Sequence, residues 1–342
     1  SAMPISEAYR RCPDAVFLYP RMERYVEVSD SIMDVFSRYS PCVEPLSLDE
    51  AFLDCSNMER LMGDARMIAS RLKGDILRET GLTCSVGASA VKSVAKIASD
   101  LNKPDGLTIC APGTEREFLA PLPVECLWGV GKKTRDILHS YGITQIRDIS
   151  SLECDAMVTL FGKNGAHLWY LSNGLDSRNV SGTADEQKSI SEEVTFDEDH
   201  SNTGVVYQLM KRMCDSLTHE LHRMRRSART VTVKVRYGSF DTVTRGHTLE
   251  TPSCSFHTLH DSARRSLQNI GLSGRNIRLI GVSFSQLTDQ RLERQCDLFE
   301  NVLAQKEIIG EELYKTLRNR YGKKICRASL LTAASRDVPD RR

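Results

Sequence analysis

The segment Ser47-Leu48-Asp49-Glu50-Ala51-Phe52-Leu53-Asp54 contains two adjacent acids within a run that otherwise alternates between apolar and polar residues. The alternation runs from Val43 to Asp54 and predicts a half-buried strand. Strands are depleted in acids and neighbouring carboxylates repel each other, so the pair requires a bound cation or a solvated turn. Two hard oxygen ligands at the rim of a sheet suit a magnesium-dependent phosphoryl-transfer site. Taken by itself, an acidic pair is also typical of a turn or an exposed edge.

Helix and strand patterns alternate after this segment. Residues 64–80 carry apolar residues at helical spacing before Gly81, which predicts a helix with a glycine stop. Residues 82–89 predict a strand in which Gly87 permits close backbone approach. A second helix is predicted over 91–102, where Pro104 and Gly106 end it, and residues 107–110 resume as a strand.

Three lysines lie on one face of the second predicted helix. Lys92, Lys96 and Lys103 are spaced by four and seven residues, which places them on the same side. Such a stripe is typical of a solvated helix face. Next to a metal-binding carboxylate pair, it would instead meet phosphate oxygens as point charges.

The two stretches SLDEAFLD and VKSVAKIASDLNKPDG together resemble the palm of the Y-family, translesion DNA polymerases, and match the bacterial DNA polymerase IV branch most closely. The resemblance continues through almost all of the remaining chain. Ala51 favours this branch over the polymerase V catalytic subunit, which tends to carry Ser there. The resemblance implies a ferredoxin-like palm that binds two magnesium ions. In it, Asp49 bridges both ions, Glu50 completes the ligands of the catalytic ion, and Lys103 contacts the incoming triphosphate.

The beginning of the sequence departs from the family pattern. The family starts with a strand that bears another metal-binding Asp, followed by an aromatic residue that excludes ribonucleotides and a Tyr-Glu-Ala-Arg segment on the fingers. Nothing in residues 1–40 supplies these, and residues 2–8 resemble the later part of the fingers instead. Asp14 and Asp30 lie outside any apolar strand of the expected kind. We therefore expect an incomplete palm sheet and an incomplete metal site.

Composition sets further bounds. A chain of 342 residues exceeds one ordinary core and predicts two or three domains. The net charge is only +1, so any DNA-binding surface must come from local clusters. Eleven cysteines without a CxxC pair argue against a zinc site or a disulfide framework and for a reducing compartment. No signal peptide and no membrane-spanning apolar run is recognisable, so we expect a cytoplasmic location. We also expect a monomer.

Residues 127–134 read Leu-Trp-Gly-Val-Gly-Lys-Lys-Thr and precede an amphipathic segment, with Gly142 at the position of a helix C-cap. This apolar-Gly-apolar-Gly pattern resembles a helix-hairpin-helix element. Glycines let a phosphate approach the backbone, and the following helix N-terminus offers unpaired N–H donors. The alternative is a plain turn between bundle helices. The residues of the predicted DNA-backbone contact are Gly129, Val130, Gly131 and Lys132.

Residues 189–290 resemble the little finger, a domain unique to this family. A helix with apolar residues from Val206 to Met224 on one face, strands over 229–237 and 242–247, a helix over 257–269 and a strand over 278–286 suit a small α+β domain. A basic cluster before the first of these strands is commonly solubilising. On this domain it alternatively follows a DNA backbone and makes binding salt-sensitive. Its members are Arg223, Arg225, Arg226 and Arg229.

The last motif is Gln295-Cys296-Asp297-Leu298-Phe299. It resembles the short peptide with which bacterial polymerases dock on the sliding clamp. A Gln amide and a Leu-Phe pair on an extended segment anchor in an apolar groove, and the rest of the peptide, Asp297 included, contributes little. Alternatively, Leu298 and Phe299 pack under a terminal helix over 303–321.

The expected organisation is α+β and multidomain. It comprises a remnant of the fingers (1–20), the palm (21–110), the helical thumb (111–177), a linker (178–188), the little finger (189–290) and a C-terminal segment with the clamp-binding peptide (291–342).

Three functions are compatible with these features of the sequence. The first is a template-directed translesion DNA polymerase of low fidelity that uses two magnesium ions, primer-template DNA, deoxynucleoside triphosphates and the sliding clamp. The second is a catalytically inactive DNA- and clamp-binding protein, because the first metal-binding Asp is missing. The third is a nucleotide cyclase, which can share this palm geometry. The hairpin, linker and clamp-like peptide argue against the third.

Overall fold

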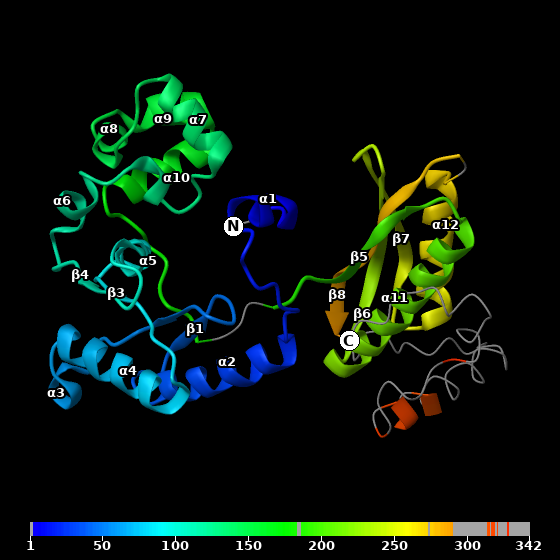
Figure 1. Ribbon diagram of the computed structural model, residues 1–342, viewed down its shortest axis with the longest axis horizontal. Coiled ribbons are helices and arrows are strands. Elements are labelled where there is room, and N and C mark those ends of the chain that lie inside the picture. Colours follow the sequence, from blue (N-terminus) through cyan, green and yellow to red (C-terminus); the bar gives the residue numbers. More distant parts are fainter. Residues whose placement is uncertain are drawn as a thin grey trace. The chain divides into compact units, whose positions relative to one another are not determined.

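The computed structural model describes residues 3–182, 186–272 and 274–289, together with residues 313, 314, 316–318, 320 and 327. The chain divides into two compact units, residues 1–184 and 185–342, and the division falls within the predicted linker. Each unit combines helices with strands (Figure 1), which confirms the α+β multidomain class.

The first half of unit 1 packs helices against two short strands. Helices α2 and α4 lie side by side along this layer (Figure 1), and Val35, Ile68, Leu72 and Ile76 form its core. The elements are α1 (Ile5–Arg11), α2 (Met22–Ser37), β1 (Val43–Pro45), β2 (Ala51–Leu53), α3 (Glu59–Met62) and α4 (Ala65–Thr80).

The prediction of a single strand over residues 43–54 is wrong. Strands β1 and β2 pair antiparallel, with Val43 opposite Leu53 and Pro45 opposite Ala51. The backbone N–H of Leu46 donates to the Glu50 carbonyl oxygen at 2.8 Å and closes the turn between them. Adjacent residues of a strand point to opposite faces, so a continuous half-buried strand would bury one of the two carboxylates, whereas the turn leaves both accessible to water.

The predicted helices on either side of Gly87 are confirmed. Asp64 caps α4 by accepting from the Met67 N–H, and Gly81 ends it in the left-handed conformation with φ of 71°. Strands β3 (Val86–Ala88) and β4 (Leu107–Ile109) pair in parallel across α5 (Lys92–Leu101). A Cβ at Gly87 would lie 2.1 Å from the Ala95 carbonyl oxygen, so glycine lets α5 approach β3 closely.

The second half of unit 1 is helical. Its core takes in Leu138, Ile146 and Leu168 and continues into α5 through Val94 and Ile97. The elements are α6 (Glu115–Leu119), the 3₁₀ helix η1 (Val124–Cys126), α7 (Lys132–Ser140), α8 (Ile146–Ser150), α9 (Cys154–Phe161) and α10 (Lys163–Ser172), of which the last four lie together in Figure 1.

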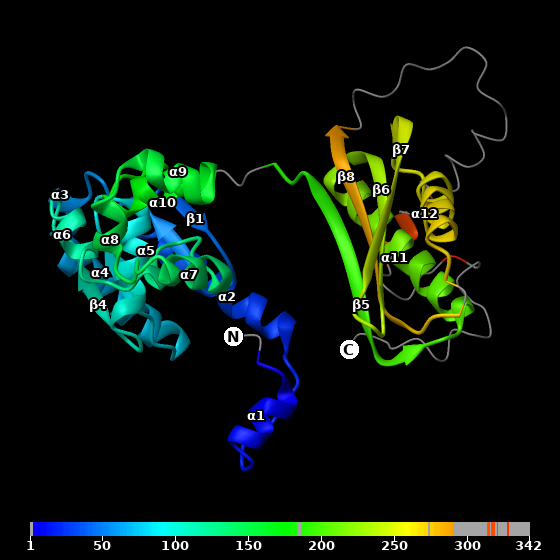
Figure 2. The same cartoon turned by 90° about the horizontal axis from the view of Figure 1, so that it is seen from above.

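Unit 2 contains an antiparallel sheet in the order β5-β8-β6-β7, with α11 and α12 covering one face (Figure 2). The predicted apolar face of the first helix is buried from Val206 to Leu221. Strand β5 was not predicted, because its only buried residues, Ile190 and Phe196, are six positions apart and Glu192 interrupts the apolar alternation between them. The elements are β5 (Ser189–His200), α11 (Thr203–Met224), β6 (Arg226–Tyr237), β7 (Thr242–Ser253), α12 (Phe256–Ile270) and β8 (Ile277–Asp289).

Within the described ranges, no helix has both the length and the apolar character needed to cross a lipid bilayer. The cysteines at described positions are all free thiols.

Candidate active site and nucleic-acid contacts

Asp49 and Glu50 lie in the turn between β1 and β2, where the chain reverses. The Ser47 hydroxyl donates to Asp49 Oδ1 at 2.6 Å, which orients that carboxylate locally. Asp49 is exposed, and the Glu50 side chain is 38 % exposed. Both carboxylates are therefore accessible from solvent while the paired strands fix the backbone that carries them.

Glu50 is the first member of a chain of alternating charges. Lys96 Nζ on α5 donates to Glu50 Oε1 at 2.9 Å and to Asp100 Oδ2 at 2.9 Å. Lys103 Nζ lies 2.6 Å from the other Asp100 oxygen. Burial lowers the pKa of Lys96, but the hydrogen bonds to Glu50 and Asp100 outweigh burial and leave it raised. Lys96 therefore stays a cation between two carboxylates.

Asp100, which the sequence did not single out, lies between Lys96 and Lys103 in this row of charges. Burial raises the pKa of Asp100, but hydrogen bonds from Lys103 and Lys96 outweigh burial and lower it. The signal that was available is the spacing of four between Lys96 and Asp100, which puts the two side chains on one helix face.

Lys92 contacts a different carboxylate from Lys96. Its Nζ lies 2.6 Å from both carboxylate oxygens of Glu44 and 4.9 Å from the centre of the Phe52 ring. The Ser181 backbone N–H also donates to Glu44 at 2.7 Å, which ties the start of the predicted linker to β1. Burial raises the pKa of Glu44, yet these hydrogen bonds lower it overall. Lys92 and Lys96 thus form ion pairs with Glu44 and Glu50, whereas the sequence predicted either a solvated helix face or phosphate contacts.

The donor set at the β1–β2 turn fits a magnesium ion. Mg²⁺ is usually bound by one or two carboxylates together with water and substrate phosphates, rather than by an all-protein cage. Asp49 and Glu50 supply two hard oxygen donors at an accessible turn. Within the described part of the chain, no group of three or more His, Cys, Asp or Glu is arranged to bind a metal.

The predicted hairpin presents its backbone to solvent. Gly129 has φ of +97°, a conformation that favours glycine, and Gly131 caps α7, which begins at Lys132. Val130 is buried in the helical core, whereas Gly129, Gly131 and Lys132 are exposed. The first N–H groups of α7 are therefore available to a phosphate.

Trp128 connects this loop with the carboxylate turn, a contact the sequence analysis did not foresee. Its ring lies 6.3 Å from that of Phe52 in β2, centre to centre. The Arg178 guanidinium lies 4.9 Å from the centre of the Trp128 ring. The predicted DNA contact and the predicted metal ligands thus belong to one packed assembly within unit 1.

The predicted basic cluster of unit 2 surrounds the turn from α11 to β6. Arg225 ends α11 with φ of +56° and is exposed. Arg223 pairs with Glu220, Arg226 pairs with Glu186 and Asp289, and Arg229 donates to the Leu249 carbonyl oxygen. The clamp-like residues Gln295, Asp297, Leu298 and Phe299 lie outside the described residues.

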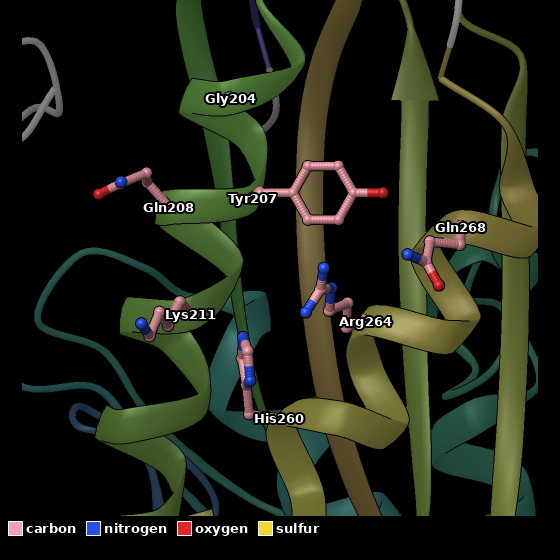
Figure 3. A pocket seen from close by; sticks show the side chains of 7 residues that line it. All are labelled: Gly204, Tyr207, Gln208, Lys211, His260, Arg264 and Gln268. Carbon is pink, nitrogen blue, oxygen red and sulfur yellow. The ribbon is translucent and has the colours of Figure 1, made fainter. Parts of the chain in front are cut away.

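A pocket of about 550 Å³ opens between α11 and α12. Figure 3 shows the Tyr207 ring and the Arg264 guanidinium between the two helices, whereas Gln208 points away. None of the predicted site residues lines this pocket. The lining residues are Gly204, Tyr207, Gln208, Lys211, His260, Arg264 and Gln268.

Three matches to known families cover much of the chain. The sequence matches the impB/mucB/samB family over residues 1–100, the C-terminal domain of that family over residues 187–298, and the helix-hairpin-helix motif of the IMS family over residues 112–143.

Similar proteins include two bacterial relatives and one solved structure. DNA polymerase IV of Desulfatibacillum aliphaticivorans is 39 % identical over 306 residues, covering 89 % of this chain and 76 % of that protein. DNA polymerase IV of Clostridioides difficile is 38 % identical over 295 residues, covering 85 % and 80 %. A solved Y-family DNA polymerase chimera aligns with a TM-score of 0.72 at 26 % identity, covering 84 % of this chain and 83 % of that chain.

Proposed function

The chain belongs to the Y-family of DNA polymerases, on the DNA polymerase IV branch, and we propose that it performs template-directed nucleotidyl transfer at Asp49 and Glu50. The observation that carries the proposal is the position of these two carboxylates, adjacent in an accessible turn and joined through Lys96 and Asp100 to Lys103.

Asp49 and Glu50 would hold two Mg²⁺ ions together with the phosphates of the substrate. When bound, these ions lower the pKa of the primer 3′-hydroxyl and neutralise charge that develops on the transferring phosphoryl group. Asp49 would hold the ions through its carboxylate, which the Ser47 hydroxyl orients. Lys103, an exposed cation beside Asp100, would contact the triphosphate as a point charge.

DNA binding is proposed at two places. The exposed backbone N–H groups of Gly129, Gly131 and Lys132 would donate hydrogen bonds to a DNA phosphate regardless of base sequence. Binding of this kind suits an enzyme that copies any template. The arginines around the α11–β6 turn would follow a DNA backbone by charge. Each such phosphate contact releases counterions, so binding should weaken as salt rises.

The remaining features of the proposal come from the family resemblance. Primer-template DNA and deoxynucleoside triphosphates are the substrates. The active site is open and weakly selective, which permits lesion bypass with low fidelity. Residues 295–299 would dock on the sliding clamp, with Leu298 and Phe299 as anchors. The proposed setting is the cytoplasm, with the chain acting as a monomer.

Primer extension tests the proposal. The chain and its Asp49→Ala variant are incubated with primer-template DNA, Mg²⁺ and all four deoxynucleoside triphosphates. We expect the parent to extend the primer and the variant to fail, with DNA affinity equal in both. Lys92→Met, which alters the pair with Glu44 outside the proposed ligands, serves as the control and should still extend.

The catalytically inactive alternative predicts a different pattern. In that case neither protein extends the primer, while both bind primer-template DNA with the same affinity. Extension that persists in the Asp49→Ala variant would show that the chemistry does not depend on this carboxylate.

A further inference from the structure

Glu50 is held by a lysine in this structure. Lys96 Nζ lies 2.9 Å from Glu50 Oε1, and the lysine side chain is only 22 % exposed. A divalent cation that binds Glu50 would have to contact the carboxylate to which Lys96 donates. The ammonium group and the metal would then be like charges close to one another, which is unfavourable. Lys96 and the metal therefore compete for Glu50.

Lys96 has a second carboxylate within reach. Its Nζ also lies 2.9 Å from Asp100 Oδ2, one helical turn further along α5. The other oxygen of Asp100, Oδ1, lies 2.6 Å from Lys103 Nζ, so this carboxylate is already positioned between two lysines. If Glu50 bound a metal ion instead of Lys96, Lys96 would keep its ion pair with Asp100. It would therefore not become a partly buried charge without a counter-ion.

We propose that Lys96 is a placeholder cation for Glu50, which a divalent metal displaces and which Asp100 then retains. By a placeholder we mean a side chain that neutralises a ligand until the metal arrives. The inference rests on the proposed function, because it requires Glu50 to be a metal ligand. It assigns Lys96 and Asp100 as positioning residues rather than as groups that touch the reacting atoms.

Lys92 is a matched comparison within the same helix. It lies one turn before Lys96, has a similar ion pair with Glu44, and is also largely buried. Its partner Glu44 is outside the proposed ligand pair. Removing the charge of Lys92 should therefore reproduce the general effect of losing one lysine from α5 without freeing Glu50.

Metal binding in the absence of catalysis tests the inference. The full chain is titrated with Mn²⁺ without DNA or nucleotide, and free Mn²⁺ is measured by electron paramagnetic resonance. Partly exposed ion pairs are weak, so we expect Lys96→Met to bind Mn²⁺ about two- to fivefold more tightly than the parent. Lys92→Met should bind as the parent does. Equal or weaker binding by Lys96→Met would overturn the proposal.

Asp100 gives a test of opposite sign. In Asp100→Asn, Lys96 has only Glu50 as a carboxylate partner, so Mn²⁺ should bind more weakly than to the parent. In the double variant that also carries Lys96→Met, this weakening should disappear, because no lysine remains to compete. If Asp100→Asn weakens Mn²⁺ binding equally in both backgrounds, Asp100 acts only through its own charge and does not retain Lys96.

The controls separate this inference from the proposed function. Glu50→Gln and Asp49→Asn should lose Mn²⁺ binding; if they bind it as the parent does, the assignment of the metal ligands fails and the inference fails with it. If they lose it while Lys96→Met changes nothing, only the role of Lys96 is overturned. Lys96→Arg keeps the charge and should bind Mn²⁺ no more tightly than the parent, and circular dichroism confirms that each variant is folded.

Discussion

Trp128 packs against Phe52, with ring centres 6.3 Å apart and ring planes tilted by 38°. Phe52 follows Glu50 by two residues in β2, and Trp128 precedes the exposed glycines of the hairpin. The Arg178 guanidinium lies 4.9 Å from the centre of the Trp128 ring, so a residue of the predicted linker joins the same cluster. Trp128 is thus one of the side chains that link the hairpin to the carboxylate turn.

Replacing Trp128 with Ala should lower the free energy of unfolding by about 1–2 kcal/mol, because the aromatic contact and the cation–π contact are both lost. Urea denaturation followed by circular dichroism measures the change. Trp128→Phe keeps an aromatic ring against Phe52 and should recover part of the loss. An Ala variant as stable as the parent would show that the contact contributes no net stability.

Replacing Gly87 with Ala should destabilise unit 1 by about 3 kcal/mol or more. The new Cβ would lie 2.1 Å from the Ala95 carbonyl oxygen and 2.3 Å from the Ser99 nitrogen. Both are backbone atoms of α5, so the helix as a whole must shift. Gly74→Ala is the control, since nothing lies within 4 Å of a Cβ there, and the change within α4 should stabilise by about 0.5–1 kcal/mol. Chemical denaturation measures the free energy of unfolding of both variants. A Gly87→Ala protein as stable as the parent would contradict the close packing of α5 on β3.

Asp176 should make unit 1 sensitive to acid. Burial raises the pKa of Asp176, but the hydrogen bonds and charge of Arg178 outweigh burial and lower it from 3.8 to about 2. A carboxyl group whose pKa is depressed by folding stabilises the folded state above its unfolded pKa. That contribution, roughly 2 kcal/mol, is lost as the pH falls from 3.8 to about 2.

The test compares the parent with Asp176→Asn in urea at a series of pH values. The parent should be the more stable at neutral pH, and the difference between the two should shrink as the solution is acidified through this range. A difference that does not change with pH would mean that the Arg178 pair contributes nothing through ionisation.

Asp215 on α11 is a buried carboxylate with two arginine partners. Arg318 contacts one of its oxygens, Arg327 Nε lies 2.8 Å from the other, and the Tyr314 hydroxyl donates at 2.9 Å. The Asp215 side chain is 4 % exposed. Asp215→Ala should cost about 3–5 kcal/mol, because it leaves buried cations without their counter-ion.

The loss should be visible as faster trypsin cleavage after Arg318 and Arg327, since local opening exposes these residues. Asp261→Ala, in the same unit but with an exposed side chain, should leave the cleavage rate unchanged. Equal rates in the parent and in Asp215→Ala would contradict a role for this carboxylate in holding Tyr314, Arg318 and Arg327.

Helices of this fold are readable in the sequence because they carry local signals. Asp64 and Gly81 mark the two ends of α4, and the apolar repeat of α11 corresponds to residues that are buried. The hairpin at 43–53 is different. The adjacent acids break the alternation at the turn, but the residues on either side of them fit one long strand as well as two three-residue strands.

The site is only half readable for a related reason. The acidic pair and the lysine stripe are recognisable as residue types. The spacing of residues on a helix, however, does not predict which side chains of other segments lie against that helix face. That Lys96 meets Glu50 and Lys92 meets Glu44 follows from the way β1 and β2 fold back across α5, which is a long-range contact. Trp128, Phe52 and Arg178 come from three separate segments, and no local pattern relates them.

Helix α5 has consequences beyond the carboxylates it faces. Val94 and Ile97 belong to the core of the helical half of unit 1, whereas Ala95 and Ser99 pack against Gly87 in β3. One helix thus completes two layers that the sequence treats as separate domains. The amide hydrogens of the two halves cannot exchange independently, because unfolding of either half removes packing contacts from α5. Unit 1 should therefore melt as a single cooperative transition, and amides in α5 should exchange hydrogen only by global unfolding.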